Sequence, residues 1–193
     1  KSNPKQIKFF IVSFILVFGL SLSFYTVDAN ENAVILRLGK YYTTTGPGLQ
    51  FKIPFLDQVY KVKVDYQYKK EFGFRTVKSD KKSQFRKRGL ENESWMLTGD
   101  LKIAEVKWVV QYKINDARNY LFNVKNVENT IVDISEASMQ LMIGDRSFSE
   151  VLQTERVNIA IEAKDYMQEL LDQYATGVSV QLVQLQGVVP PEP

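Results

Sequence analysis

The chain contains neither cysteine nor histidine. Without cysteine it has no disulfide, no thiol nucleophile, no cysteine-ligated zinc or iron–sulfur site and no lipidated cysteine anchor. Without histidine it has no Ser-His-Asp or Cys-His machinery, no HExxH zinc site and no side chain whose unperturbed pKa lies near neutrality. Carboxylate, Ser/Lys or Tyr chemistry stays open to such a chain. We nevertheless predict a protein that is not an enzyme and that holds no cofactor and no metal.

The 193 residues are 45% apolar and 24% charged, a balance typical of an ordered protein with one or two small domains. The sequence starts at Lys1 without a methionine and stops in a proline-rich run, "VVPPEP". We therefore expect it to be part of a longer polypeptide.

The net charge of +3 is unevenly distributed along the chain. Residues 69–93 carry nine basic and four acidic side chains, whereas the part from Asp116 onward carries twelve acidic and five basic ones. The sequence therefore has a basic middle and an acidic C-terminal part.

An uncharged run of nineteen residues, 9–27, follows the first lysines. As a helix it reaches about 28 Å, close to the thickness of a bilayer's hydrocarbon core. A cleaved signal peptide is the main alternative, since Val27 and Ala29 suit the positions before a cleavage site. We predict an uncleaved membrane span, because the run is longer than a typical signal-peptide core. The side chains predicted to lie in the span are Phe9, Phe10, Ile15, Leu16, Phe18, Leu20, Leu22, Phe24 and Tyr25.

The lysines before the span outnumber the basic residues soon after it, Arg37 and Lys40, which favours a cytoplasmic N-terminus and an external main part. The predicted organisation follows from this topology. It comprises a cytoplasmic flank over 1–8, the span over 9–27, a β-rich part over 28–125 that includes the basic insertion 69–93, and an α/β part over 126–193.

Four stretches alternate apolar and other residues with a period of two, as antiparallel strands with one buried face do. The apolar sets are Val34, Leu36 and Leu38; Leu49, Phe51, Ile53 and Phe55; Tyr60, Val62, Val64, Tyr66 and Tyr68; and Val106, Trp108, Val110, Tyr112 and Ile114.

Gly46, Pro47 and Gly48 predict a turn between two strands, because glycine tolerates a positive φ and proline fixes its own φ. Pro54 cannot donate a ladder hydrogen bond, so we expect it at a strand end or an edge. The aromatic residues after the turn either fill the core of a hairpin or meet the lipid headgroups. The alternation favours the core. The candidates for membrane contact are Phe51, Lys52, Phe55, Leu56 and Tyr60.

From about Asn126 the apolar period becomes helical, and a first helix is predicted to end at Gly144. Ser147 and Glu150 fit a capping box, and Thr154 is predicted to cap a longer helix. The predicted inward residues are Ile131, Ile134, Ala137 and Leu141 in the first helix, and Val157, Ala160, Ile161, Met167, Leu170, Leu171 and Tyr174 in the second, which Gly177 ends. The strand "VSVQLVQLQ" follows and stops at the two prolines. We predict an α+β fold, strands first and helices later.

The stretch "ENAVILRLGKYYTTTGPGLQFKIPFLDQVYKV" resembles the opening of the SPFH, or band 7, superfamily, which includes stomatin, prohibitin, flotillin and the HflK and HflC proteins. The shared pattern is a strand ending in R-x-G-K, followed by P-G-L-x-F-K-x-P-F. "WMLTGDLKIAEVKWVVQYKINDARNYLFNV" and "LMIGDRSFSEVLQTER" are similar to the central strands and the helix junction of that superfamily, and "GVSVQLVQLQGVVPPEP" is similar to its HflK branch.

The resemblance implies a scaffold in the bacterial inner membrane, with the SPFH domain in the periplasm and a coiled-coil region after it. Proteins of this branch co-assemble with an HflC-like paralogue into large rings or cages. These enclose the AAA+ protease FtsH and limit its access to membrane substrates. Two features depart from the pattern: the segment 71–94 is long, and Asp116-Ala117 stands where relatives usually have Asp-Pro.

The basic segment 75–88 is interpreted first as a solvated loop, second as a contact to anionic lipid or to an acidic neighbouring subunit, and last as a nucleic-acid site. The contact candidates are Lys81, Lys82, Arg86, Lys87 and Arg88. The carboxylates of the helices, among them Asp133, Glu136, Asp165, Glu169 and Asp172, are interpreted as a solvated surface.

Three hypotheses for the function stand. They are a membrane-anchored scaffold that regulates a protease, a lipid-organising scaffold of the stomatin or prohibitin type without a protease partner, and a hydrolase that uses Ser/Lys or carboxylates.

Overall fold

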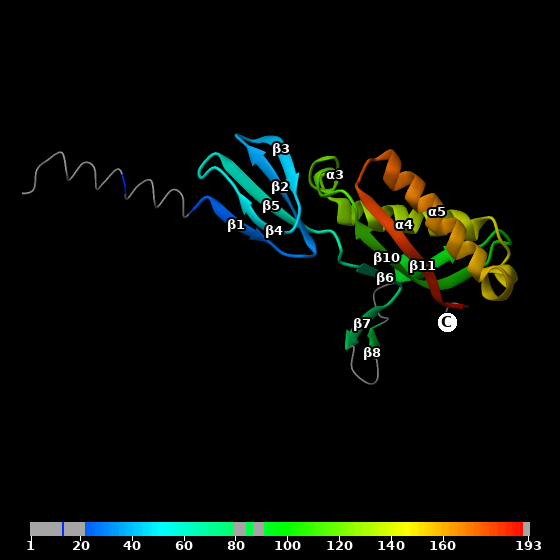
Figure 1. Cartoon of the computed structure of the whole chain (residues 1–193). Coiled ribbons are helices and arrows are strands. Elements are labelled where there is room, and N and C mark those ends of the chain that lie inside the picture. Colours follow the sequence, from blue (N-terminus) through cyan, green and yellow to red (C-terminus); the bar gives the residue numbers. More distant parts are fainter. Residues whose placement is uncertain (1–12, 14–21, 79–83, 87–90, 191–193) are drawn as a thin grey trace, which may run out of the picture. The chain divides into compact units, whose positions relative to one another are not determined.

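The computed structural model of the chain describes residue 13 and residues 22–78, 84–86 and 91–190 (Figure 1). The chain divides into two compact units, residues 1–65 and residues 66–193, which we describe separately. The strand Ile103–Ile114 pairs with the strand Val178–Val189, so one sheet contains residues from both sides of the predicted division between residues 125 and 126.

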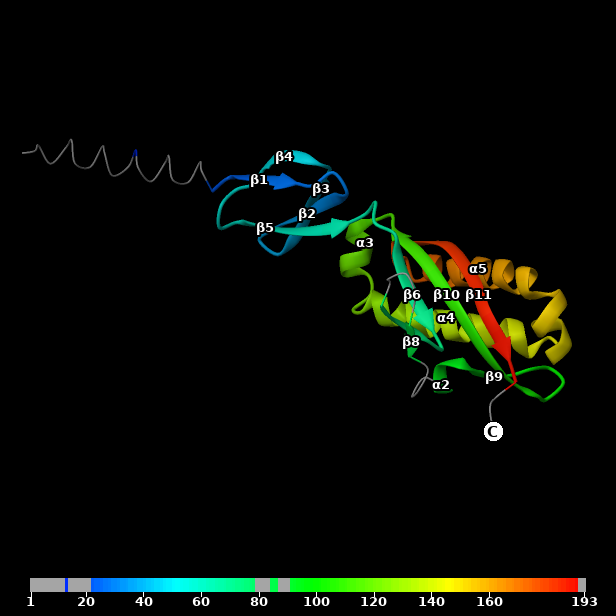
Figure 2. The ribbon, with the colours of Figure 1, turned by 90° about the horizontal axis from the view of Figure 1, so that it is seen from below.

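Two antiparallel sheets form the described part of the first unit (Figure 2). β2 (Glu31–Arg37) lies between β3 (Lys40–Thr45) and β5 (Asp57–Lys63), and β1 (Phe24–Val27) pairs with β4 (Gly48–Phe51). The side chains buried in this small core are Val27, Ala33, Val34, Ile35 and Val62.

β1 corrects the predicted end of the membrane span. Phe24 and Tyr25 lie in a strand that pairs with β4, and Leu22 lies in the turn before it, so residues 22–27 do not form the end of a helix. Aromatic and β-branched side chains suit a pleated strand, and β4 supplies the hydrogen-bonding partner. The other predicted span residues, Phe9 to Leu20, fall outside the described residues.

The predicted turn at Gly46, Pro47 and Gly48 is confirmed, because these residues connect β3 to β4 and Gly48 has a φ of +114°. β3 and β4 belong to different sheets, however, so the predicted hairpin is wrong. Pro54 lies in the connection between β4 and β5, where no ladder hydrogen bond is needed.

The core role favoured for the aromatic residues after this turn is also wrong. Leu49, Phe51 and Phe55 are exposed, because β4 pairs with the short β1 and the chain leaves the sheet after Phe51. Leu38 is exposed too, in the turn between β2 and β3. The predicted strand over residues 60–68 is interrupted, since β5 ends at Lys63 and β6 begins at Tyr68.

β10 (Ile103–Ile114) is the central strand of the second unit. β11 (Val178–Val189) pairs with it on one side, and β6 (Tyr68–Phe72) and β9 (Trp95–Leu97) pair with it on the other. β7 (Arg75–Lys78) and β8 (Gln84–Arg86) form a separate ribbon, and the short helix α2 (Glu91–Ser94) leads into β9. The alternation predicted for β10 is confirmed: Val106, Trp108, Val110, Tyr112 and Ile114 are all buried.

Helices α4 (Val127–Gly144) and α5 (Arg156–Gln173) pack against this sheet and share its core (Figure 2). α3 (Ala117–Phe122) follows β10, and a short π-helix, η1 (Glu150–Thr154), precedes α5. The Trp108 ring stacks on Phe72 with 4.6 Å between centroids, and Trp108 Nε1 donates a hydrogen bond of 2.9 Å to Ser135 Oγ on α4. A buried polar group is therefore satisfied where helix and sheet meet.

The helix caps predicted from the sequence are confirmed only in part. The predicted capping box is confirmed, since Glu150 Oε2 accepts from both the backbone N–H and the hydroxyl of Ser147 at 2.7 Å. Thr154 does not cap α5, because the π-helix runs through it and α5 begins at Arg156. Asp116 caps α3 by accepting from Asn119 N at 3.0 Å, and Ala117 occupies the first helical position, where proline also fits.

The predicted inward faces of the two long helices are partly wrong. In α4, Ile131 and Ile134 are buried, but Ala137 and Leu141 are exposed. In α5, Met167 and Leu171 are buried with Ile159 and Ala163, which lie four residues apart and form the stripe that meets the sheet. Ala160 and Leu170 border this stripe. The exposed residues predicted to face inward in α5 and just after it are Val157, Ile161 and Tyr174.

Gly177 provides a test of the junction between α5 and β11. Its φ is +71°, and a Cβ there would lie 2.4 Å from Asp116 O, so Gly177→Ala forces a backbone shift. We expect this variant to destabilise the second unit by roughly 2 kcal/mol or more, measured by urea unfolding followed through tryptophan fluorescence. Gly187→Ala within β11 is the matched control, because no heavy atom lies within 4 Å of the added Cβ. Equal stability of the two variants would contradict this account.

Candidate interaction surfaces

No group of acidic side chains in the described ranges has the arrangement of a metal site. Asp133, Asp165, Glu169 and Asp172 are exposed on the helices, as interpreted from the sequence. Glu136 is half-buried, and burial raises its pKa, with repulsion from Glu93 and Asp133 adding to the effect. The exposed surfaces of the two units are the remaining candidate sites.

One end of the first unit is fixed by an ion pair between β2 and β5. Arg37 Nε and Nη2 donate to the two carboxylate oxygens of Asp57 at 2.8 and 3.0 Å, and the Asp57 side chain is 1% exposed. Asp57 Oδ2 also accepts from Ile53 N at 2.8 Å, and Asp57 N donates to Ile53 O at 3.0 Å. The two hydrogen bonds to Ile53 therefore close the 53–57 loop on itself, and the ion pair ties this loop to the end of β2.

The hydrogen bond from Arg37 outweighs the burial of Asp57 and, with the bond from Ile53 N, lowers the pKa of the Asp57 carboxyl. The Arg37 guanidinium lies 3.8 Å from the centroid of the Tyr42 ring, close enough for a cation–π contact. A bidentate pair of this kind has a defined geometry as well as an attraction.

The closed loop presents apolar side chains to the outside. Phe55 is 96% exposed and Leu38 is 76% exposed, and both have a positive φ, of +67° and +51°. Leu38 N donates to Leu56 O at 3.0 Å, so the turn after β2 lies beside the loop before β5. Phe51 pairs with Phe24 across β1 and β4, with 5.8 Å between ring centroids in an edge-to-face arrangement.

These side chains lie at the same end of the first unit, where β1 starts, β4 ends and β5 starts (Figure 2). We call this surface the apolar end. It consists of Leu22, Phe24, Leu38, Phe51, Phe55 and Leu56, all of them exposed.

Three of the predicted membrane-contact residues, Phe51, Phe55 and Leu56, belong to the apolar end, and Lys52 follows Phe51 directly. Tyr60 does not belong to it, because it lies within β5 opposite Val34. Sequence reasoning missed Leu38, which it placed in the core. The signal was the adjacent Gly39, whose φ of +80° shows that the strand has already ended there.

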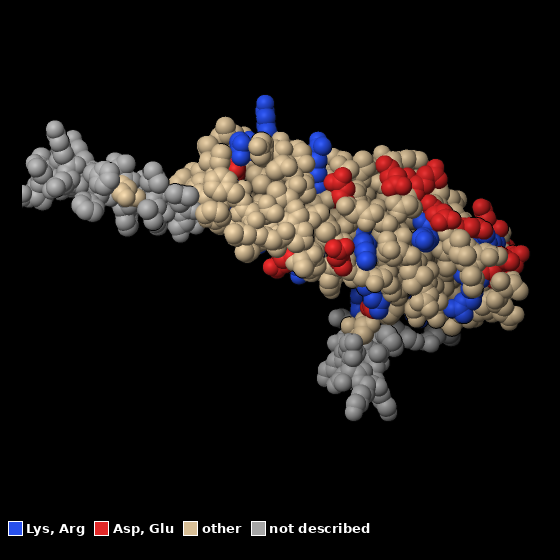
Figure 3. Space-filling model, viewed as in Figure 1, with Lys and Arg blue, Asp and Glu red and all other residues tan. Residues whose placement is uncertain are grey.

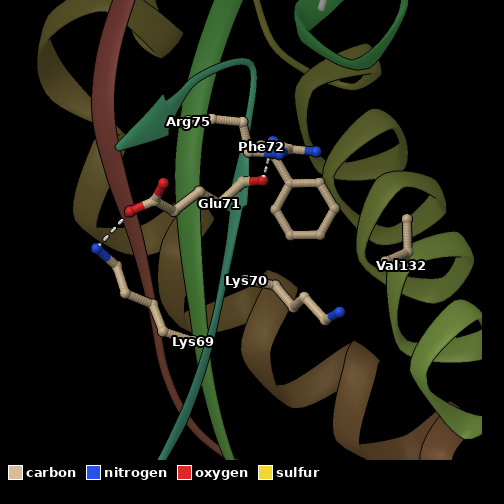
Figure 4. A pocket seen from close by; sticks show the side chains of 6 residues that line it. All are labelled: Lys69, Lys70, Glu71, Phe72, Arg75 and Val132. Carbon is tan, nitrogen blue, oxygen red and sulfur yellow. Dashed lines mark hydrogen bonds and ion pairs between the residues drawn. The ribbon is translucent and has the colours of Figure 1, made fainter. Parts of the chain in front are cut away.

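A pocket of about 270 Å³ lies beside β6 in the second unit (Figure 4). Lys69 bonds Glu71 at 2.7 Å, Lys70 bonds Glu128 at 3.0 Å, and Arg75 makes two bonds of 3.0 Å to Glu93. Burial opposes the ionisation of Glu71, but hydrogen bonds from Lys69 and from Thr76 outweigh it and lower its pKa. Since the three cations each have an acidic partner, the pocket is best described as an ion-pair network at the edge of the sheet.

Comparison with known sequences identifies the family of this chain. Residues 25–192 match the SPFH domain / Band 7 family. The chain belongs to this family.

Several bacterial members of the family are close in sequence to this SPFH chain. It is 46% identical over 180 residues to the protein HflK of Treponema pallidum, which covers 92% of the chain and 55% of that protein. It is 36% identical over 168 residues to HflK of Borreliella burgdorferi, covering 87% of the chain and 53% of that protein. It is 25% identical over 178 residues to the Escherichia coli K12 protein named modulator of FtsH protease HflK, covering 92% and 38%. The chain thus spans about half the length of the first two of these relatives.

The motif residues that carried the resemblance have visible structural roles in this SPFH domain. In the R-x-G-K stretch, Arg37 holds Asp57 and Gly39 makes the turn with its positive φ. In the P-G-L-x-F-K-x-P-F stretch, Gly48 opens β4, and Phe51 and Phe55 lie in the apolar end. The motif therefore builds a closed loop with an exposed apolar tip.

Two further predictions, the membrane span over 9–27 and the contacts of the basic segment 75–88, fall largely on residues outside the described ranges. No helix among the described residues has the length and apolar character needed to cross a membrane. Lys81, Lys82, Lys87 and Arg88 lie outside the described residues, and Arg86 is placed only as part of β8. Their contact to a subunit or to lipid stays a prediction.

The ion pair that ties the 53–57 loop to β2 leads to a pH-dependent prediction. The folded state lowers the pKa of Asp57, so its stabilising contribution is complete above the unfolded pKa, about 3.9, and is lost as the pH falls through the lower folded value. Asp57→Asn should therefore speed amide hydrogen exchange in β2 and β5 several-fold at pH 7, measured by mass spectrometry, with a smaller difference in acid.

Asp65→Asn serves as the control for Asp57→Asn, because Asp65 is an exposed carboxylate of the same unit. It should leave the exchange of β2 and β5 unchanged. If both variants behave alike, the ion pair does not hold the loop.

Proposed function

We propose that this chain is a membrane-anchored scaffold subunit of a large ring or cage of the HflK/HflC type. In this proposal it assembles with copies of itself, with an HflC-like paralogue, or with both. The assembly encloses an FtsH-type AAA+ membrane protease and regulates it by limiting the access of substrates. Membership of the SPFH/Band 7 family and the name of the E. coli relative support this role.

The observation that carries the proposal is the apolar end of the first unit. Two of its residues, Leu22 and Phe24, lie in the last part of the uncharged run, and the Arg37–Asp57 pair ties to β2 the loop that exposes Phe55. Apolar side chains that are exposed to water do not stabilise the fold. An aromatic side chain at a membrane interface is stabilised by contact with the lipid headgroup layer. In this proposal the run before β1 anchors the chain, and the apolar end rests on the bilayer surface.

The proposed topology places the N-terminus in the cytoplasm and both units in the periplasm, at the bacterial inner membrane. The chain has neither histidine nor cysteine, so the metal and the ATPase of regulated proteolysis are assigned to the protease and not to this chain. Its own contribution is then geometric: anchored subunits share one plane, which raises their effective concentration for lateral assembly.

A lipid-organising scaffold of the stomatin or prohibitin type, without a protease partner, is the alternative function. The apolar end favours it equally, because contact with lipid is common to both functions. The presence or absence of the protease in the native assembly separates the two.

The absence of cysteine makes the proposed membrane contact directly testable. An environment-sensitive fluorophore on Phe55→Cys, in the chain reconstituted into phosphatidylethanolamine–phosphatidylglycerol vesicles, should show blue-shifted emission and be quenched by nitroxide-labelled lipid. The matched control is the same label on Asp165→Cys, an exposed position of α5, which should emit as in water. Water-like emission from both positions would refute the membrane contact.

Affinity capture tests the protease partner. The tagged chain, extracted from its native membranes with a mild detergent, should elute as a large assembly that contains an FtsH-type protease. A large assembly without the protease supports the lipid-organising alternative instead. A solitary chain in intact membranes, shown by crosslinking before extraction, contradicts both functions.

A further inference from the structure

The acidic residues of the first unit gather at the end opposite the apolar end. Glu31 N donates to Asp28 O at 3.1 Å, and Asp65 N donates to Asn30 O at 3.4 Å. These contacts bring the three acidic residues together where β1 ends, β2 starts and β5 ends. The remaining acidic residue among residues 22–65 is Asp57, which is buried at the apolar end and neutralised by its ion pair to β2. The apolar end therefore presents no unpaired carboxylate within residues 22–65.

Basic side chains, in contrast, flank the exposed apolar side chains of the apolar end. Leu38 lies in the turn between Arg37 and Lys40, and Lys52 directly follows Phe51. Figure 3 shows basic side chains at the upper edge of the first unit, where β2 ends and β3 starts. The two ends of the first unit thus differ in the sign of their charge, and the positive end is also the apolar one.

Two of these cations, Lys40 and Lys52, have no carboxylate within ion-pair distance in the described part of the chain. Lys40 is exposed and stands opposite Arg37 in the pairing of β2 with β3, so two positive charges face each other there. Lys52 is half-buried, and its charge adds to the effect of Arg37 in lowering the pKa of Asp57. Like charges directly opposite each other destabilise a sheet, and a nearby anion would offset that cost.

The backbone fixes Lys52 beside the apolar side chains. Lys52 N donates to Ser23 O at 2.7 Å, which joins the end of β4 to the residue before β1. A lysine side chain has an apolar stem and a terminal charge, so its ammonium can stay at the level of lipid phosphates while neighbouring apolar side chains lie deeper. Exposed apolar tips with cations directly beside them are therefore suited to a bilayer surface that carries negative charge.

From this arrangement we infer that the apolar end selects anionic phospholipid. Lys40 and Lys52 contact the phosphates of headgroups with a net negative charge, and Leu38, Phe51 and Phe55 lie deeper, next to the first acyl carbons. A zwitterionic headgroup offers the same phosphate, but its own cation cancels the attraction. The inference rests on the membrane contact in the proposed function and specifies the class of lipid that makes this contact.

Vesicles of different charge test the lipid class. The full chain, labelled with an environment-sensitive fluorophore at Phe55→Cys, is reconstituted into phosphatidylcholine alone and into phosphatidylcholine mixed with phosphatidylglycerol. The anionic mixture should give the larger blue shift and the stronger quenching by nitroxide-labelled lipid. High salt should reduce the difference, because it screens exposed charges. Equal contact in both kinds of vesicle overturns the inference and leaves the membrane contact of the proposed function standing.

Two pairs of substitutions test the assigned cations. Lys40→Gln together with Lys52→Gln should lower the ratio of lipid-contacting to water-exposed label in anionic vesicles, by about fivefold for each lysine. The matched control is Lys61→Gln together with Lys63→Gln, which removes the same charge from β5, away from the apolar end. The control should keep the preference for anionic lipid. An equal loss in both pairs assigns the preference to net charge and overturns the role of the apolar end.

Lys40→Gln alone keeps the test independent of folding. Because Lys40 is exposed, the substitution should leave amide hydrogen exchange in β2 and β5 unchanged. The preference for anionic lipid should still fall about fivefold. An undiminished preference in this variant and in the Lys40/Lys52 pair contradicts the assignment of the two lysines.

A protein partner at the apolar end gives a different pattern. Water-like emission in every vesicle, combined with a blue shift in the assembly extracted from native membranes, assigns the apolar end to a protein contact. That result overturns both this inference and the membrane contact. Capture of the protease in the same assembly would still support the scaffold function, so the two failures are distinguishable.

Discussion

The pairing of β10 with β11 determines the architecture of the second unit. The two strands run antiparallel from Ile114 opposite Val178 to Glu105 opposite Val189, with two register shifts between them. Helices α4 and α5 lie in the chain between these strands, so the pairing draws both onto the sheet and closes the core around Trp108 and Tyr112. The contact is distant in sequence, and its loop-closure entropy is offset only when the helices bury their apolar stripes. Gly177, at the entry to β11, makes the close approach to Asp116 possible.

The same pairing decides which surfaces remain open. Since β10 occupies the centre, β11 becomes one edge of the sheet, and β6 and β9 become the other. One edge is uncharged and is covered in part by α5, while the other carries an ion-pair network and exposed apolar groups.

The first unit retains costs that its own fold does not offset. Leu38 and Phe55 are non-glycine residues in left-handed backbone, which costs roughly 1–2 kcal/mol for each residue. Their side chains also forgo burial, worth about 1.5–3 kcal/mol for a large apolar group. The Arg37–Asp57 pair enforces the conformation. In the proposed position on a membrane, contact with lipid at the apolar end would remove the Leu38 and Phe55 side chains from water. That contact would offset part of the cost of their strained backbone.

The sequence by itself determined the family, the α+β class, the central strand with its buried Trp108 and Tyr112, the turn at Gly46–Gly48 and the capping box at Ser147. Each of these depends on local periodicity, on backbone freedom or on hydrogen bonds within a few residues. Tertiary structure decided the rest. From the sequence, Phe51, Phe55 and Leu38 were predicted to lie in a core, and Val157 and Ile161 were predicted to face inward. These predictions are wrong because alternation and helical spacing show that side chains share a face but not whether another element covers that face. Whether a face is covered depends on strand pairing between distant segments, which left β4 with only the short β1 and made β11 an edge.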